Sequence, residues 1–258
     1  MKWLLPLLLL ITLSPLQAAV QSKAVTYADQ GVTFTGHLYW DDAITGQRPG
    51  VLVIHEWWGL NDYARKRARM LAELGYVAFA ADMYGNNQVT EEAAQAREWM
   101  QEVTADVEDW RHRAMLGLEQ LRASPMVDAD RLAAIGYCFG GATVLHMSYA
   151  DAPLAGVVSF HGAMPAAPAE SQGKIGPKIL VLHGMADQFV APEVVANFRN
   201  KLQEAGADWE MNTYGGDVRH GFTNPDAGQF GIPNLKYDAI ADRRSWAKMQ
   251  GFFDEIFQ

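Results

Sequence analysis

The feature that most constrains this fold is a series of short apolar runs that alternate with helical segments. Val51–Ile54 is a continuous apolar run, which is typical of a strand buried on both faces of a parallel sheet. Further strands are expected at 76–81, 131–137, 155–160, 179–183 and 209–214, and helices at 62–74, 91–103, 106–122, 142–149, 192–205 and 238–257. This alternation predicts an α/β fold, with a mostly parallel twisted sheet and helices on both faces.

A β-hairpin is expected ahead of these units. Residues 32–40 alternate apolar and polar side chains, and residues 24–28 precede them across the turn Asp29-Gln30-Gly31, a pattern that favours two antiparallel strands. The 258-residue chain contains no internal repeat and no Pro/Gly-rich linker. A chain of this length often folds undivided in α/β proteins, so residues 20–258 are predicted to form one domain.

The first nineteen residues have the pattern of a secretory signal peptide. Lys2 is followed by the apolar run Leu4–Leu13 and then by the small residues Ala18 and Ala19. The run is shorter than the ~20 apolar residues that a membrane-spanning helix requires. We therefore expect cleavage near Ala19, export to the periplasm or the exterior, and no stable membrane insertion of the mature chain. An uncleaved N-terminal anchor is the alternative.

Charge and residue spacing argue against several classes of partner. The formal net charge is −9 and the sequence pI is about 5.2, whereas binding of nucleic acid requires clustered Lys and Arg. No pair of His, Asp or Glu has convincing metal-ligand spacing, and no Gly-rich phosphate loop is present. The sequence predicts no metal, no cofactor and no nucleic-acid partner, and it leaves the oligomeric state open.

The single cysteine lies in a sequence that is typical of a nucleophile. Because the chain has one Cys, no intrachain disulfide can form, although exported proteins often carry them. Cys138 is the centre of Gly136-Tyr137-Cys138-Phe139-Gly140-Gly141, which follows a predicted strand and precedes a predicted helix. This is the nucleophile-elbow pattern with Cys in place of Ser. Alone, it also fits a structural cysteine beside a tight turn.

Two further segments supply a candidate acid and a candidate base. Asp187 ends His183-Gly184-Met185-Ala186-Asp187, and His220 begins His220-Gly221-Phe222, each after a predicted strand. Carboxyl ends of parallel strands lie at one edge of a sheet, where active sites form. The order nucleophile, acid, histidine is that of α/β-hydrolases. We therefore predict an α/β-hydrolase fold with a Cys138–His220–Asp187 triad.

These motifs resemble the dienelactone hydrolase family. The resemblance rests on residues 54–59 (Ile-His-Glu-Trp-Trp-Gly), 82–84 (Asp-Met-Tyr), 136–141, 183–187 and 220–225 (His-Gly-Phe-Thr-Asn-Pro). It runs from about Tyr27 to Phe257 and implies hydrolysis of carboxylic esters or lactones without a cofactor.

The resemblance also implies individual roles. Glu56 matches the glutamate that contacts the resting thiol and helps to govern its activation. Trp57 and Phe139 match the residues whose backbone N–H groups form the oxyanion hole. The side chains expected to form the substrate pocket are Trp58, Tyr84, Asn86, Phe222 and Asn224.

Two positions depart from the founding members of the family. Those enzymes hold a substrate carboxylate with two arginines, and the matching residues here are Asn86 and Asn224. Since neither is charged, the predicted substrate is a neutral ester or lactone and not dienelactone itself. The alternative functions are a cysteine peptidase and a non-catalytic thiol-sensing or binding protein.

Overall fold

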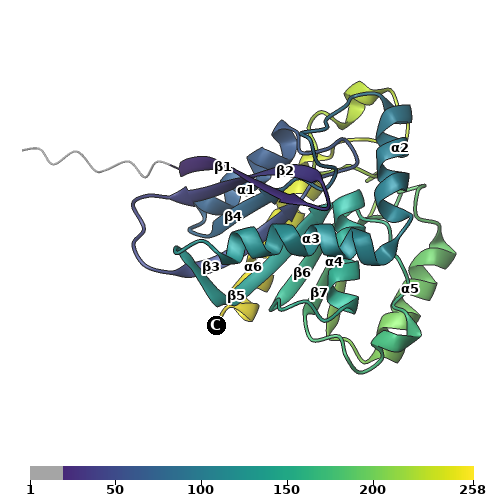
Figure 1. Cartoon of the computed structure of the whole chain (residues 1–258). Helices are drawn as coiled ribbons and strands as arrows, with labels where there is room; N and C mark the ends of the chain where they lie inside the picture. The colour runs from purple at the N-terminus through teal and green to yellow at the C-terminus, as the bar shows by residue number, and fades with distance from the viewer. Residues whose placement is uncertain (1–19) are drawn as a thin grey trace, which may run out of the picture.

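The computed structural model describes residues 20–258, so the predicted signal peptide lies outside the described residues (Figure 1). The described residues contain one eight-stranded sheet in the order β1-β2-β4-β3-β5-β6-β7-β8. Strands β1 and β2 are antiparallel to their neighbours, and the other neighbouring strands pair in parallel. Their bounds are β1 Val20–Asp29, β2 Val32–Asp41, β3 Arg48–Ile54, β4 Val77–Ala81, β5 Val127–Tyr137, β6 Gly156–Phe160, β7 Lys178–Gly184 and β8 Trp209–Tyr214.

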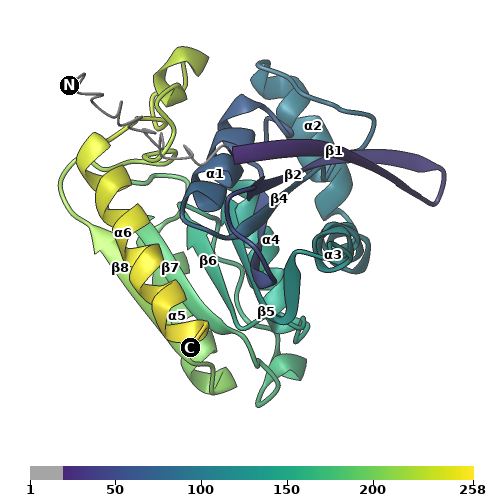
Figure 2. The same cartoon turned by 90° about the vertical axis from the view of Figure 1, so that its left-hand side faces the viewer.

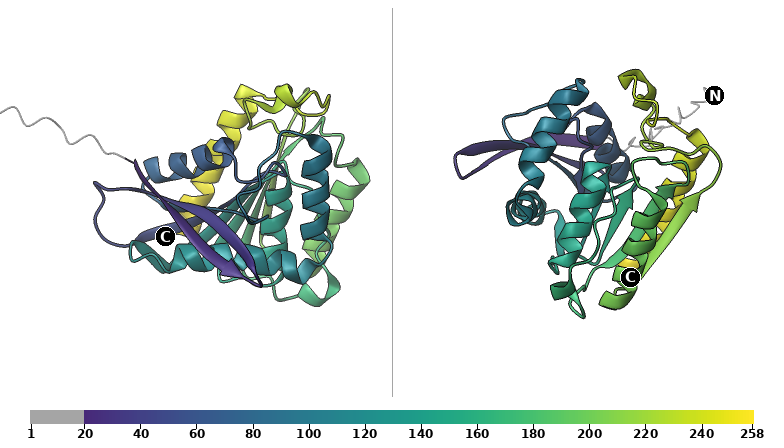
Figure 3. Two further views of the ribbon diagram at one scale, coloured as in Figure 1. Left: turned by 45° about the horizontal axis from the view of Figure 1, so that its top comes forward. Right: turned by 90° about the vertical axis from the view of Figure 1, so that its right-hand side faces the viewer.

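Helices cover both faces of the sheet, as predicted (Figures 2 and 3). One face packs against α3, α4 and α5, and the other packs against α1 and α6. The α-helices are α1 Asp62–Glu73, α2 Ala93–Thr104, α3 Val107–Arg122, α4 Phe139–Tyr149, α5 Pro192–Ala205 and α6 Ala239–Ile256, with short 3₁₀ helices η1 Ala169–Ser171 and η2 Ala227–Phe230. The architecture confirms the predicted α/β-hydrolase fold class.

Local physics explains most of the element boundaries. Asn61, Asp106 and Asp238 cap α1, α3 and α6, because their side chains accept hydrogen bonds from backbone N–H groups of the first turn. The N-terminal hairpin turns at Gln30 and Gly31, which both have positive φ, as a two-residue hairpin loop requires. The start of α4 was predicted three residues late, since the helix begins at Phe139 and not at Ala142.

The early start of α4 follows from the conformation of Cys138. This residue has φ 54° and ψ −112°, so the chain leaves β5 and enters the helix within a single residue. Such strained backbone is concentrated at functional sites, where the surrounding structure maintains it. The predicted elbow is therefore sharper than the sequence pattern alone indicated.

Close backbone packing around the elbow explains its glycines. A Cβ at Gly136 would lie 1.9 Å from the Gly140 carbonyl oxygen, and one at Gly140 would lie 2.4 Å from the Ile54 carbonyl oxygen. The Gly140 N–H also donates to the His55 carbonyl at 3.1 Å. These contacts hold the end of β3 against the elbow, so residues following β3 and β5 share one edge of the sheet.

A buried arginine attaches α1 to the segment that follows His220. Arg67 is 4% exposed and pairs with Asp242 of α6 at 2.6 Å. Its guanidinium also donates to the Thr223 carbonyl oxygen at 2.5 Å and lies over the rings of Tyr63 and Trp246. An unpaired buried charge is costly, so this pairing ties the segment after the histidine to two helices.

Within residues 20–258, no helix is both long enough and apolar enough to cross a membrane.

Replacing Gly136 by Ala is expected to destabilise the fold by about 1–3 kcal/mol, because the new methyl group meets backbone that cannot move without disturbing the elbow. Gly228→Ala is the matched control, since a Cβ there has no neighbour within 4 Å. Urea unfolding of both variants measures the difference. Equal stability of the two variants would contradict the role assigned to Gly136.

Candidate active site

Cys138 lies at the carboxyl edge of the sheet, between β5 and the first turn of α4. Its N–H donates to the Phe160 carbonyl oxygen at 3.0 Å, which fixes the elbow against the end of β6. The residue is partly buried and forms no disulfide. The residue also packs against the hydrophobic core on the face of α3, α4 and α5.

The structure brings His220 and Asp187 together as predicted. The Nδ1–H group of His220 donates to Asp187 Oδ2 at 2.8 Å, and both residues are buried. Burial alone would lower the pKa of His220, but Cys138 and Asp187 raise it to about 10 by Coulombic attraction and hydrogen bonding. His220 Nε2 is buried and has no hydrogen-bond partner within residues 20–258, and Cys138 is near enough to the ring to raise its pKa.

Asp187 is held by a residue that sequence reasoning missed. Asn234 Nδ2 donates to Asp187 Oδ1 at 3.2 Å, and the Phe189 N–H donates to the same oxygen at 2.9 Å. Burial alone would raise the pKa of Asp187, but the hydrogen bonds from His220, Phe189 and Asn234 hold it below its usual value. No motif marks Asn234, which lies in a loop 47 residues after the acid.

Two backbone N–H groups beside the cysteine are unpaired. Neither Trp57 nor Phe139 donates its N–H to another group within residues 20–258. The hydrogen bond from Gly140 N–H to the His55 carbonyl places the segment of Trp57 against the turn of Phe139. Unpaired N–H groups at a nucleophile are the donors that an oxyanion hole requires.

Glu56 is fully enclosed and pairs with Asn224. Asn224 Nδ2 donates to Glu56 Oε2 at 2.7 Å, and both side chains are buried. Burial raises the pKa of Glu56 to about 7, opposed by the Asn224 hydrogen bond and by the charges of His220 and Arg67. Glu56 and Cys138 share no hydrogen bond within residues 20–258, so the predicted contact with the resting thiol stays a prediction.

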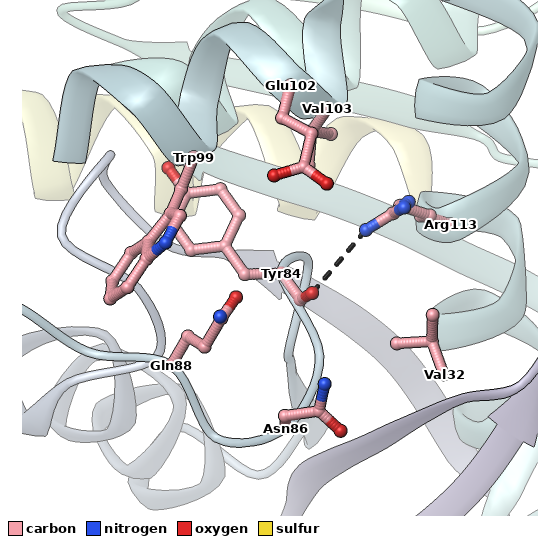
Figure 4. A pocket seen from close by; sticks show the side chains of 8 residues that line it. All are labelled: Val32, Tyr84, Asn86, Gln88, Trp99, Glu102, Val103 and Arg113. Carbon is pink, nitrogen blue, oxygen red and sulfur yellow. Dashed lines mark hydrogen bonds between the residues drawn. The ribbon is translucent and has the colours of Figure 1, made fainter. Parts of the chain in front are cut away.

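A polar cavity of about 140 Å³ lies next to Tyr84 (Figure 4). Asn86 and Gln88 line it together with the oppositely charged Glu102 and Arg113. Burial and the neighbouring Cys138 raise the pKa of Tyr84, so Tyr84 both lines the cavity and is near the cysteine. The two predicted pocket residues Tyr84 and Asn86 therefore line a real cavity.

Trp58 and Phe222 are buried among other aromatic rings. Trp58 is 2% exposed and stacks on Phe230, and Phe222 is fully buried against His161 and Tyr214. The place of these two residues in the substrate pocket stays a prediction. Aromatic side chains in loops are as readily core as pocket, and the sequence did not show what packs over them.

An aromatic residue that the sequence analysis did not assign lies beside the histidine. Phe189 packs edge-on against the His220 ring, with 5.1 Å between centroids, yet it is 54% exposed. Met185, in the same loop, is also exposed. A large apolar side chain that contacts the histidine and faces solvent is suited to hold the apolar part of a small ligand.

No group of three or more His, Cys, Asp or Glu side chains that could hold a metal ion is found in the described part of the chain.

Comparison with known proteins shows the family of the chain. The model of the dienelactone hydrolase family matches residues 34–257. The chain belongs to the dienelactone hydrolase family. The family assignment makes it a hydrolase and confirms the resemblance seen in the sequence.

One solved structure and two relatives illustrate how similar the chain is to known proteins. A solved structure of a dienelactone hydrolase-like promiscuous phosphotriesterase from metagenomic libraries is 42% identical, with a TM-score of 0.89, over 93% of this chain and 100% of that one. A putative carboxymethylenebutenolidase of Methylorubrum extorquens is 24% identical over 81% of this chain and 72% of the relative. A probable lactonase of Bradyrhizobium, named for 2-oxo-3-(5-oxofuran-2-ylidene)propanoate, is 24% identical over 77% and 84%.

Glu56→Gln is expected to change how stability depends on pH. The folded-state pKa of Glu56 is about 7 against an ordinary value of 4.5, so the folded chain retains a proton that the unfolded chain releases between these values. The free energy of unfolding of the wild type therefore falls as pH rises through this interval. Gln removes this loss, so the variant gains about 2–3 kcal/mol relative to wild type between pH 4.5 and pH 8. Urea unfolding at both pH values measures it, and parallel profiles would contradict the buried carboxyl.

Asn234→Ala is expected to lower turnover roughly tenfold, because Asp187 loses a donor that fixes the carboxylate under His220, and tenfold corresponds to about 1.4 kcal/mol in the barrier. The exposed Asn197→Ala is the control. Steady-state rates with an aryl ester measure the effect. Identical rates for both variants would show that Asp187 does not depend on Asn234.

Proposed function

We propose that this hydrolase cleaves neutral carboxylic esters or lactones through a Cys138–His220–Asp187 triad and a thioester intermediate. The observation that carries the proposal is the position of His220. One ring nitrogen donates to Asp187 at 2.8 Å, and the other is buried without a hydrogen-bond partner in a ring whose pKa the neighbouring Cys138 raises. A nucleophile, a base and an orienting acid arranged in this way are the working parts of acyl transfer.

Acylation begins with attack of the sulfur on the substrate carbonyl carbon. His220 takes the thiol proton, and its raised pKa of about 10 means that this proton is held strongly next to the sulfur. The carbon–sulfur bond forms, and the carbonyl electron pair moves to oxygen, where the Trp57 and Phe139 N–H groups donate to it. The intermediate collapses as the ester oxygen leaves with the proton from His220.

Deacylation reverses these roles. His220 removes a proton from water, and the resulting hydroxide attacks the thioester carbonyl. The carbon–sulfur bond breaks, the carboxylic acid is released, and the proton held by His220 restores the starting Cys138–His220 pair. A thiolate is itself a good leaving group, so acylation succeeds best when the substrate's leaving group is also good. Enol lactones and activated esters meet this condition better than amides.

Glu56 is proposed to modulate the thiol. Its pKa of about 7 lets the carboxyl group exchange a proton near neutral pH, and perturbed carboxyls of this kind occur at functional sites. Release of that proton on substrate binding would change the charge beside the Cys138–His220 pair. Its buried partner Asn224 is neutral and holds the carboxyl in place without fixing its charge.

The charges around the site favour neutral substrates. The cavity beside Tyr84 carries one cation and one anion, Arg113 and Glu102, and its other polar groups are the amides Asn86 and Gln88. Asn224, the second expected carboxylate-binding position, is already paired with Glu56. The rim beside His220 is the apolar Phe189. We therefore propose that the enzyme takes substrates without a carboxylate.

Cys138→Ala is expected to reduce hydrolysis of a neutral aryl ester to background, because the attacking sulfur is removed. The wild type should also cleave the neutral ester with a higher kcat/KM than dienelactone. Spectrophotometric rates on both substrates measure these effects. Full activity of the Ala variant would overturn the triad, and faster cleavage of dienelactone would overturn the neutral-substrate proposal.

The two alternatives give different results in the same set of assays. A cysteine peptidase would cleave a peptide panel faster than esters. A thiol-sensing protein would lack both activities but would still react with iodoacetamide at Cys138. Loss of esterase activity in parallel with alkylation is the outcome that supports the proposed function.

A second activity, hydrolysis of phosphotriesters, is favoured by one finding. The metagenomic phosphotriesterase is 42% identical over 93% of this chain. A sulfur that attacks a carbonyl carbon can also attack phosphorus, and the same N–H groups then face the phosphoryl oxygen. Release of nitrophenol from a diethyl nitrophenyl phosphate by wild type, and its absence in Cys138→Ala, is the test.

Export is proposed from the N-terminal pattern. The first strand starts at Val20, next to the expected cleavage site. Expression of the full chain followed by fractionation and N-terminal sequencing tests it. A chain that retains residues 1–19 after fractionation would favour the anchor instead.

A further inference from the structure

His55 lies in the motif at residues 54–59, and the mechanism above gives it no role. Its side chain is 0% exposed, between the rings of Tyr84 and Phe139 at 5.0 and 5.9 Å. It stands directly after β3 and directly before Glu56 and Trp57. A fully buried histidine at this place has both ring nitrogens engaged, and its partners are informative.

The partners of the two ring nitrogens fix the tautomer. The Met83 backbone N–H approaches His55 Nε2 at 3.2 Å and can only donate, so Nε2 is the acceptor. The other nitrogen, Nδ1, lies 2.5 Å from the Glu56 carbonyl oxygen, which can only accept. Nδ1 therefore carries the hydrogen. Burial lowers the pKa of His55 more than the Glu56 carbonyl and the charge of Asp82 raise it. A lowered pKa agrees with a neutral ring.

The acceptor of this bond belongs to the peptide unit that carries the Trp57 N–H. The Glu56 carbonyl and the Trp57 N–H are two ends of one planar group, and no peptide bond within residues 20–258 is cis. In a trans peptide the N–H points opposite to the carbonyl. A hydrogen bond that holds the Glu56 carbonyl towards His55 therefore turns the Trp57 N–H away from it.

We propose that His55 is a positioning residue that sets the oxyanion hole, by holding the Glu56–Trp57 peptide with its N–H directed at the reacting carbonyl oxygen. This inference rests on the proposed function, since it concerns the same site. The Gly59 N–H also donates to the Glu56 carbonyl, but at the longer distance of 3.3 Å. Tyr84 restrains the next peptide, because its hydroxyl donates to the Trp57 carbonyl oxygen at 2.8 Å. Of the two hydrogen bonds to the Glu56 carbonyl oxygen, the one from His55 is shorter than the one from Gly59.

Two substitutions distinguish the hydrogen-bonding roles of the two ring nitrogens of His55. His55→Asn places an amide N–H where Nδ1 stood and keeps the donor to Glu56. His55→Gln reaches the position of Nε2 and keeps the acceptor for Met83 but loses the donor to Glu56. If His55 only filled space or only held Met83, the Gln variant would be the milder change. The proposal predicts the opposite order.

The expected result is a fall in kcat of about 10²-fold or more in His55→Gln, the range seen when one oxyanion donor is lost. KM should change little, and His55→Asn should restore most of the lost turnover. The rate of alkylation of Cys138 by iodoacetamide should stay the same in both variants, because that reaction develops no oxyanion. Equal kcat in the wild type and the Gln variant would overturn the proposal, as would alkylation rates that fall in parallel with kcat.

A measurement on the wild type covers the case in which a variant does not fold. Selective ¹⁵N labelling of the seven histidines reports the tautomer of each ring by NMR. The proposal requires a neutral His55 with hydrogen on Nδ1, and hydrogen on Nε2 would refute it. A wild-type protein without esterase activity would instead contradict the proposed function. Failure of the proposed function and failure of the His55 proposal are therefore distinguishable.

Discussion

The close approach of two backbones is the constraint on which the rest of this site depends. Gly140 lies so near the end of β3 that its side-chain position is occupied by the Ile54 carbonyl, and its N–H bonds to the His55 carbonyl. This contact fixes the distance between the elbow that carries Cys138 and the segment that carries Trp57. The proposed nucleophile and the proposed oxyanion donor, which follow different strands, thereby become one rigid unit. Rigid placement is what lets such donors act without reorganisation during the reaction.

The histidine side of the site is supported by a separate set of buried contacts. His220 follows β8 in a loop, and loops by themselves position side chains loosely. Here the next residues are tied down, because the Thr223 carbonyl oxygen accepts a hydrogen bond from Arg67 and the Thr223 hydroxyl is hydrogen-bonded to Tyr63 and His161. Arg67 in turn pairs with Asp242. The C-terminal helix therefore contributes to the geometry of the site through the pair between Asp242 and Arg67.

The sequence predicted the elements of the fold and the pairing of His220 with Asp187 because each depends on a local pattern. Apolar runs predict buried strands, and residues that end parallel strands meet at one edge of the sheet. What the sequence did not predict depends on packing between distant segments. Asn234 supports Asp187 from a loop without a motif. Trp58 and Phe222 are buried by neighbours that no local pattern identifies. The exact start of α4 was missed because the strained backbone of Cys138 replaces the usual connecting turn.

One residue type at position 224 accounts for two properties of the site. An arginine there would offer a substrate carboxylate a cation and would also stabilise the ionised form of Glu56. Asn224 offers Glu56 only a hydrogen bond from a neutral amide. Its lowering of the Glu56 pKa is smaller than the rise caused by burial, so the pKa is raised to about 7. An anionic substrate would then approach Asp187 and a Glu56 that is ionised for part of the time, with no arginine at position 86 or 224 to balance it. The proposed preference for substrates without a carboxylate and the titration of Glu56 near neutral pH therefore follow from the same missing charge.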